Sequence, residues 1–275
     1  MISVAMATYI GELYIRQQLE SIFNQTIKID ELVICDDCST DDTLSIVKDV
    51  AKKYNAFDKC KIIVNARNVG YIANFKKAIA AAHGDYIFLC DQDDVWRPDK
   101  VEKMTKTIQE TGAMLLASNF CLIDKNGNEL KDQDKLQLKK RLMRYHGICM
   151  WNFSDLVFDN KIPGCTYCFC KEAKEAFLND YVDYIPHDYQ LILLSALIGT
   201  VYYTDDCLIE YRIHDTNTIG LGGNKTAKLI RKIGKPKMVS YLETLEKHYK
   251  LCDFRIFKIA YYLRIPLLKS ILTHR

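Results

Sequence analysis

The sequence of 275 residues lacks the features that mark several classes of protein. It has no run of about 18 apolar residues, the length that a membrane-crossing helix needs. It has no internal repeat or low-complexity tract, and its first residues carry no basic leader, so we expect no secretory signal. With 49% apolar and 27% charged residues, the composition is that of a globular rather than a disordered or fibrous protein.

Dense cysteine pairing is also lacking. The eleven cysteines are odd in number and scattered, unlike those of short extracellular disulfide scaffolds. Four lie in or beside apolar, strand-like runs, where a free cysteine behaves as a small hydrophobe: Cys35, Cys90, Cys121 and Cys207. We therefore expect a reduced, cytoplasmic protein. The C-x-x-C spacing near residue 165 can indicate zinc or redox chemistry, but no second pair faces it, so a structural role is favoured.

The net charge of +3 conceals an asymmetry. From Lys225 onward there are 13 Lys and Arg against 3 Asp and Glu, so this tail carries +10 and the preceding residues −7. A basic tail on an acidic body favours a polyanionic neighbour, either a membrane surface or a nucleic acid. Because the chain has no DNA- or RNA-binding signature, we expect no nucleic-acid partner.

The first 120 residues alternate short apolar runs with helical patterns, at the spacing of parallel strands joined by crossover helices. Strands are expected at residues 2–7, 31–35, 61–65, 85–90 and 113–120, and helices at 12–24, 39–54, 74–82 and 98–110. A hairpin turn at 124–128 follows, and further elements are expected at 166–170, 171–179, 189–198, 200–203 and 207–211. We predict an α/β domain at 1–224, with a mostly parallel sheet flanked by helices, and a basic helical extension at 225–275.

Ligands of such sheets bind outside the carboxyl ends of the strands, and acidic residues lie there in this chain. Asp91, Asp93 and Asp94 directly follow an expected strand and would repel one another unless a cation lay among them. Mg²⁺ prefers sites shared between carboxylates and substrate phosphates, so Asp91 and Asp93 are candidates for a metal–diphosphate site. For Asp94 the role of an acid at the N-terminus of the next helix is an equal alternative.

A second acidic pair, Asp36 and Asp37, ends the second expected strand. A carboxylate there could accept a hydrogen bond from a nucleoside, and Thr8 and Tyr9 would offer polar groups and an aromatic face for the base. The alternatives are a turn with a helix cap for the acids and core packing for Tyr9.

Four segments carry a resemblance to a known family. They read Ala-Thr-Tyr at 7–9, Cys-Asp-Asp-Cys-Ser-Thr-Asp at 35–41, Asn-Val-Gly at 68–70 with Asn-Phe at 74–75, and Leu-Cys-Asp-Gln-Asp-Asp-Val-Trp at 89–96. In this order and spacing they resemble family 2 glycosyltransferases of the GT-A (Rossmann-like) fold, over at least residues 1–120. The segments 164–166, 186–189 and 211–214 look like the rhamnosyltransferase-type branch that builds bacterial surface polysaccharides.

The resemblance implies roles on the donor side. Thr8, Tyr9, Asp36 and Asn68 would hold the nucleoside, and Asp91 would touch the ribose or the metal shell.

The resemblance also implies a metal and a base. Asp93, with Asp91, would bind the Mg²⁺ or Mn²⁺ that bridges the diphosphate, and His214 would contact the metal or the diphosphate. Arg212 would act on the donor side. Such a metal would neutralise charge on the leaving group. Asp188 matches the catalytic base, which must take the proton of a weakly acidic acceptor hydroxyl.

Some assignments have alternatives. Asp188 also fits a helix N-cap, and its neighbour His187 would either orient it or simply pack. Ile10 stands where the family often has asparagine, and Cys38 where it often has glycine. These two positions therefore do not specify which nucleobase the donor carries.

The tail interleaves basic residues with aromatic and aliphatic ones, which favours adsorption to an anionic membrane surface where a lipid-linked acceptor would be presented. The alternatives are helices that pack on the main domain and a homo-oligomer contact.

We therefore expect a metal-dependent inverting glycosyltransferase, peripheral on the inner face of the cell membrane. It would use a dTDP- or UDP-linked donor, with L-rhamnose as candidate sugar, and a glycan or lipid-linked acceptor. A sugar nucleotidyltransferase would need a glycine-rich phosphate loop, which residues 5–11 do not offer. A non-catalytic nucleotide-sugar-binding assembly protein would not need Asp188.

Overall fold

The computed structural model describes residues 1–130, 142, 145–158, 160–214 and 235–249. Its strands are β1 (Ile2–Thr8), β2 (Glu31–Asp36), β3 (Cys60–Val64), β4 (Tyr86–Cys90), β5 (Val95–Trp96), β6 (Leu115–Ile123), β7 (Ile148–Trp151), β8 (Tyr167–Cys170) and β9 (Val201–Arg212). Its helices are α1 (Ile15–Phe23), α2 (Thr43–Lys53), α3 (Tyr71–Ala81), α4 (Lys100–Thr111), α6 (Phe153–Leu156), α7 (Lys171–Asn179), α8 (His187–Ile198) and α10 (Lys235–Tyr249), with 3₁₀ turns η1 (Phe57–Lys59) and η3 (Gly164–Thr166). The alternation expected over the first 120 residues is confirmed.

Within the described residues, nine strands form one sheet in the order β3-β2-β1-β4-β8-β6-β9-β5, with β7 pairing β9. The half formed by β3, β2, β1 and β4 is parallel, as expected. The other half is mixed: β8 is antiparallel to both β4 and β6, and β5 and β7 are antiparallel to β9. Because β8 is antiparallel to both of its neighbours, β6 runs in the same direction as β4.

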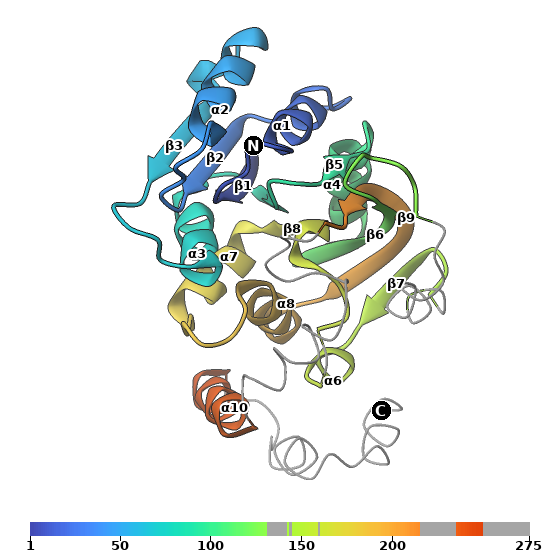
Figure 1. The fold of residues 1–275 in the computed structure, drawn as a ribbon. Helices are drawn as coiled ribbons and strands as arrows, with labels where there is room; N and C mark the ends of the chain where they lie inside the picture. The colour runs from blue at the N-terminus through green and yellow to red at the C-terminus, as the bar shows by residue number, and fades with distance from the viewer. Residues whose placement is uncertain (131–141, 143–144, 159, 215–234, 250–275) are drawn as a thin grey trace.

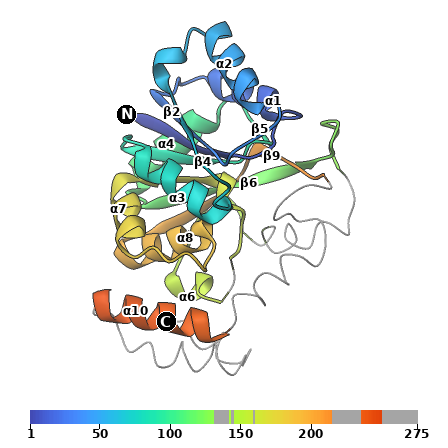
Figure 2. The same ribbon diagram turned by 60° about the vertical axis from the view of Figure 1, so that its left-hand side comes forward.

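The core follows from the central strands, whose side chains are buried on both faces. Residues 4–6 of β1 and 87–90 of β4 are fully buried apolar runs, typical of parallel strands covered on both sides. Figures 1 and 2 show α1 and α2 on one side of the sheet and α3, α7 and α8 on the other, where these three helices contact one another. This layering leaves the carboxyl ends of the parallel strands free for a site.

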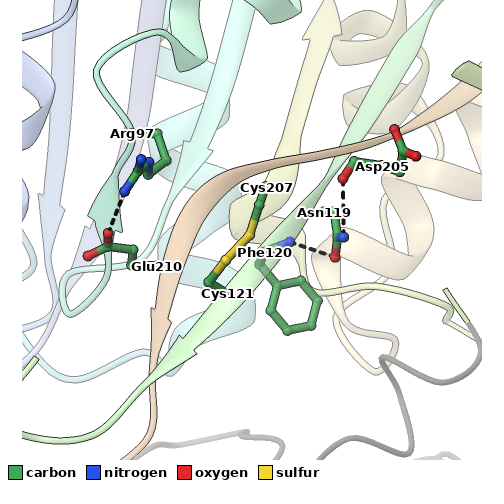
Figure 3. The surroundings of a disulfide bond; sticks show 7 residues. All are labelled: Arg97, Asn119, Phe120, Cys121, Asp205, Cys207 and Glu210. Carbon is green, nitrogen blue, oxygen red and sulfur yellow. Dashed lines mark hydrogen bonds and ion pairs between the residues drawn. A yellow bond between two sulfur atoms is a disulfide. The ribbon is translucent and has the colours of Figure 1, made fainter. Parts of the chain in front are cut away.

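Strand β9 differs from the sequence prediction of two strands, because it runs continuously beside β6 with a bulge near Asn119. The Asn119 side chain donates to the Asp205 carbonyl at 3.2 Å and accepts from Phe120 N–H at 2.9 Å, which replaces ladder bonds at the irregularity. Cys207, which pairs with Asn119 at the bulge, forms a disulfide with Cys121, with a Cα–Cα distance of 6.0 Å (Figure 3). The expectation that these two cysteines are free is therefore wrong, because adjacent strands bring together residues 86 positions apart.

The described part of the basic tail is α10, which lies below α8 at the bottom of the molecule in Figures 1 and 2. Its apolar side chains Met238, Tyr241, Leu242 and Leu245 are fully buried. His248 and Tyr249 both hydrogen-bond to Asp180, the residue after α7. For this helix the alternative of packing on the main domain is therefore the one observed, while the expected boundary at 224/225 lies outside the described residues. No helix in the described ranges is long and apolar enough to cross a membrane.

Candidate active site

The register of the parallel strands brings the sequence motifs to one edge of the sheet. Thr8 pairs with Asp36 across β1 and β2, and Met6 pairs with Cys90 across β1 and β4. The segments that follow these strands therefore start from the same edge, as the sequence predicts.

On the expected nucleoside side, Asp36 is fully buried and holds the loop after β2. Its carboxylate accepts from Thr8 Oγ1 at 2.8 Å, from Ser39 N–H at 2.8 Å and from Ser39 Oγ at 2.6 Å. Tyr9 is 46% exposed, so the alternative of a packed core residue is wrong. Nucleoside contacts of Thr8, Tyr9 and Asp36 stay predictions.

The loop that carries Asn68 is shaped by Asp37, a residue to which the sequence analysis gives no role beyond the acidic pair. The Asp37 carboxylate accepts from Val69 N–H, Gly70 N–H and Asn65 Nδ2, each at 2.8 Å. Asn68 is exposed, and its Oδ1 accepts from Gly70 N–H at 3.2 Å. The buried acid therefore organises the loop, and Asn68 is left accessible to a ligand.

The two departures from the family pattern lie at left-handed backbone positions. Ile10 has φ +50° and Cys38 has φ +70°. Asparagine tolerates this region and glycine adopts it without steric cost, whereas a β-branched residue there is strained. The residues usual in the family are thus those that the backbone favours.

The three carboxylates that follow β4, those of Asp91, Asp93 and Asp94, lie in different surroundings. Burial, then the charges of Asp93 and Asp188, raises the pKa of Asp91 to about 7. Asp93 Oδ2 lies 2.8 Å from His214 Nε2. Asp94 is buried, its pKa is raised well above its usual range by burial, and it accepts from the Arg212 backbone N–H at 3.0 Å. The alternative that Asp94 caps the next helix is wrong, since the cap position of α4 is Asp99.

A fully buried lysine lies behind these acids. Lys100 Nζ donates to the Cys165 carbonyl at 2.9 Å and lies 4.4 Å from the centre of the Trp96 ring. Burial lowers the pKa of Lys100, while the nearby charge of Asp94 raises it. Sequence analysis missed this residue because a lysine at a helix start usually faces solvent.

Arg212 is buried as well, and its guanidinium contacts protein groups. Nε donates to the Asp93 carbonyl at 2.7 Å, Nη2 to Gln17 Oε1 at 2.7 Å and Nη1 to the Asp124 carbonyl at 3.2 Å. The guanidinium also lies 4.8 Å from the Tyr14 ring centre. Its donor contact stays a prediction, and its side chain joins α1 to the segments that follow β4 and β6. Arg212 and Lys100 are positively charged side chains near the acidic residues. Repulsion among these acids therefore does not by itself require a metal ion.

Asp188 lies in the first turn of α8 and is half-buried. The cap position is Pro186, so the alternative of an N-cap aspartate is wrong. Asn160 Nδ2 donates to Asp188 Oδ2 at 2.7 Å, and Tyr189 N–H donates to Oδ1 at 2.8 Å. Asn160 is a second residue that sequence analysis missed, because no motif marks it.

His187 packs rather than holding Asp188. Its ring stacks on Phe75 with centroids 4.0 Å apart, and the Tyr71 ring meets it edge-on at 6.1 Å. Burial lowers the pKa of His187 to about 4, so the imidazole is neutral near pH 7.

The structure brings together only part of the predicted metal set: Asp93 and His214 are in contact, but among the described residues the three ligand groups whose atoms all lie within 4.8 Å of one another are Asp91, Asp94 and Cys165. Burial and the neighbouring carboxylates raise the pKa of Asp91, and a cation bound beside it would lower that pKa again. Asp91, Asp93 and His214 offer oxygen and imidazole ligands. The alternative group of Asp91, Asp94 and Cys165 fits a divalent cation poorly, because burial raises the pKa of the Cys165 thiol well above its usual range.

Known proteins are similar to this chain in sequence and in fold. The family model described as glycosyl transferase family 2 matches residues 3–168. The dTDP-rhamnosyl transferase RfbG of Shigella flexneri is 30% identical over 237 residues, which are 82% of this chain and 77% of that protein. The putative teichuronic acid biosynthesis glycosyltransferase TuaG of Bacillus subtilis is 26% identical over 83% of this chain and 84% of its own length.

Among solved structures, S. aureus TarS 1–349 in complex with UDP-GlcNAc superposes with a TM-score of 0.64 at 17% identity, over 98% of this chain and 77% of that one. The mixed α/β, Rossmann-like architecture is thus the GT-A fold of that neighbour. Since the family model matches more than half of the residues, the chain belongs to glycosyl transferase family 2.

Proposed function

We propose that the chain transfers a sugar from a dTDP- or UDP-linked donor to a glycan or lipid-linked acceptor, with inversion, in the synthesis of a bacterial surface polysaccharide. The observation that carries the proposal is the position of Asp188. A Cβ added at Gly164 would lie 2.7 Å from Asp188 Cβ and 3.4 Å from Leu89 Cδ1, so η3 links the start of α8 to β4, the strand directly before Asp91. A separate carboxylate is thus placed beside the acidic strand end.

Asp188 is proposed to act as the general base. Its carboxylate would take the proton of the acceptor hydroxyl as that oxygen attacks the anomeric carbon. One base and one displacement invert the configuration, and no covalent intermediate is needed. When bound at Asp91, Asp93 and His214, Mg²⁺ or Mn²⁺ would supply charge neutralisation for the leaving diphosphate.

The donor is proposed from the accessible groups and from the relatives. Tyr9 and Asn68 are exposed at the edge where Asp36 and Asp37 hold the loops, which suits a nucleoside. The name of RfbG supports a dTDP-linked L-rhamnose donor, and the UDP-GlcNAc complex of TarS supports a UDP-linked one. The name of TuaG supports a surface polysaccharide as the product.

The basic tail is proposed to hold the protein at an anionic membrane surface, with the acceptor presented there. Lys237 and Lys247 belong to the described part of the tail, and most of its 13 basic residues lie outside the described ranges. The full chain should co-sediment with vesicles containing anionic lipid at low salt and be released at high salt. Equal binding to neutral vesicles would contradict an electrostatic contact.

Calorimetric binding tests the donor site. The panel comprises UDP, dTDP, UDP-GlcNAc, UDP-glucose and dTDP-L-rhamnose, each with Mn²⁺ and again with a chelator. We expect metal-dependent binding of one nucleotide class, and Asp93→Ala should remove the metal dependence. Asp99→Ala, at an exposed carboxylate before α4, is the matched control.

The outcomes separate the alternatives. Binding that is unchanged by the chelator would contradict the metal role. Tight donor binding without turnover on any glycan or lipid-linked acceptor would favour a non-catalytic nucleotide-sugar-binding protein. Release of pyrophosphate from a nucleoside triphosphate and a sugar phosphate would favour a sugar nucleotidyltransferase, which the family membership argues against.

A further inference from the structure

The carboxylate of Asp188 is held from two sides. Asn160 Nδ2 donates to Oδ2 at 2.7 Å, from a segment 28 residues earlier in the chain. The Tyr189 N–H donates to Oδ1 at 2.8 Å. Each oxygen therefore keeps a lone pair free for another proton donor.

Asn160 is itself fixed. The Tyr167 hydroxyl lies 3.2 Å from Asn160 Oδ1 and 3.0 Å from the Ile162 carbonyl, and Tyr167 is fully buried. The Tyr167 hydroxyl shares its single hydrogen between these two oxygens, and the acceptor oxygen of the Asp188 carboxylate at 2.7 Å sets the orientation of the Asn160 amide. The amide therefore offers its N–H, and not its oxygen, to Asp188.

Two further contacts restrict the same carboxylate. Gly164 lies so close to Asp188 that an added Cβ would be 2.7 Å from Asp188 Cβ. The next residue, Tyr189, is anchored through its hydroxyl, which donates to the Val157 carbonyl at 2.8 Å. The start of α8 is thus joined to the 157–167 region at Val157, Asn160 and Gly164, and rotation of the Asp188 side chain is confined.

We propose that Asn160 is the positioning residue of the base. It fixes one oxygen of Asp188 and directs the remaining lone pairs toward the acceptor hydroxyl. A positioned base is worth far more than a mobile one, because small displacements of a reacting group cost about 100-fold in rate. The inference rests on the proposed role of Asp188 and adds a residue that no motif marks.

The test uses Asn160→Ala and Asn160→Asp in the full chain, with release of nucleoside diphosphate from the panel donor that wild-type protein turns over. We expect kcat to fall about 10- to 100-fold, with donor Kd unchanged within about twofold. Asn160→Asp should also move the acidic limb of the kcat–pH profile to higher pH, because a second carboxylate disfavours the charged form of Asp188. Asn24→Ala, which removes an asparagine–tyrosine hydrogen bond on the surface, is the matched control and should behave as wild type.

A double-mutant cycle excludes a merely structural effect. In an Asp188→Asn background, Asn160→Ala should cause little further loss of kcat, because the group that it positions is already gone. Tyr167→Phe should reproduce part of the Asn160→Ala loss, and a crystal structure of Asn160→Ala should show Asp188 in another rotamer.

The two proposals fail separately. If Asp188→Asn retains wild-type turnover, the base assignment of the proposed function is wrong. If Asp188→Asn is inactive while Asn160→Ala keeps wild-type kcat, or if the two mutations are additive, Asn160 does not position the base.

Discussion

Gln92 forms two hydrogen bonds with the backbone of Tyr9. Gln92 Oε1 accepts from Tyr9 N–H at 2.8 Å, and Nε2 donates to the Tyr9 carbonyl at 3.0 Å. The side-chain amide thus acts as a strand neighbour would, and it joins the loop after β1 to the acidic end of β4. Gln92 therefore connects the expected nucleoside subsite at Tyr9 directly to the expected diphosphate subsite at the end of β4.

Gln92→Ala should weaken donor binding by up to about 30-fold, because two hydrogen bonds of about 1 kcal/mol each no longer hold Tyr9. Calorimetry with the selected donor measures the change. Gln109→Ala, at an exposed position of α4, should leave Kd unchanged. Wild-type affinity of Gln92→Ala would show that the loop is held by its other contacts.

Asp188→Asn should bind the donor as wild type does but lose transfer by about 10²- to 10⁴-fold, because the amide cannot accept the hydroxyl proton. Donor Kd and kcat are measured on the same preparation. Asp183→Asn, at an exposed site before α8, is the matched control. Turnover near wild type in Asp188→Asn would place the base elsewhere.

At the left-handed positions Ile10 and Cys38, a substitution is expected to stabilise the protein, whereas most substitutions destabilise it. Cys38→Gly should raise the free energy of unfolding by about 1 kcal/mol. Glycine has no Cβ, so it removes the steric strain that a side chain causes at φ +70°. The corresponding rise in Tm is about 2 °C for a domain of this size. Ile10→Asn should also stabilise the chain. Asn55→Gly, at φ +50° in a residue that tolerates this region, should change Tm less; an equal gain would mean that the strain argument is wrong.

His187 should make stability depend on pH. Burial lowers its folded pKa to about 4, below the unfolded value of about 6.5, so the unfolded chain binds more protons between these values. The contribution of His187 is fully present above about pH 6.5 and is lost as the pH falls toward 4, by an amount on the order of 3 kcal/mol.

Urea unfolding of wild type and His187→Phe at pH 4.5 and 7 measures this contribution, because phenylalanine can keep the stack on Phe75 and does not titrate. The variant should lose less stability on acidification than wild type. His146→Phe, at an exposed histidine, should follow the wild-type pH dependence. Identical slopes for wild type and His187→Phe would rule out the buried neutral histidine.

Lys100→Met should lower the free energy of unfolding by about 3 kcal/mol, because it removes the hydrogen bond to the Cys165 carbonyl and a buried positive charge near Asp91 and Asp94. Lys103→Met, on the same helix, breaks exposed ion pairs with Asp99 and Asp206 and should cost less than about 1 kcal/mol. Chemical denaturation of both variants gives the comparison. Equal stabilities would show that Lys100 does not offset Asp91 and Asp94.

The parallel half of the fold could be predicted because each strand from β1 to β4 is a short apolar run followed by a helical pattern. The place of β8 could not, since its four residues, Tyr167–Cys170, acquire their position only by pairing with strands on either side. Likewise, the single strand β9 reads as two because the bulge interrupts its alternation.

The candidate site shows the same division. Asp91, Asp93 and Asp36 could be found because acids at strand ends stand out in the sequence. Lys100 and Asn160 could not, because their partners lie 65 and 28 residues away and only the folded chain brings them together. The Cys121–Cys207 disulfide could not be predicted for the same reason.

The order of the sheet also has a consequence for synthesis. Strand β4 is completed early, but its outer neighbour β8 follows roughly 80 residues later, about 4–16 s at ordinary rates of translation. Until then the emerging chain presents the unpaired main-chain groups of β4, a template for pairing with another molecule. Fragments that stop before β8 should therefore associate through the exposed edge of β4. During synthesis, a chaperone could shield this edge until β8 pairs with it.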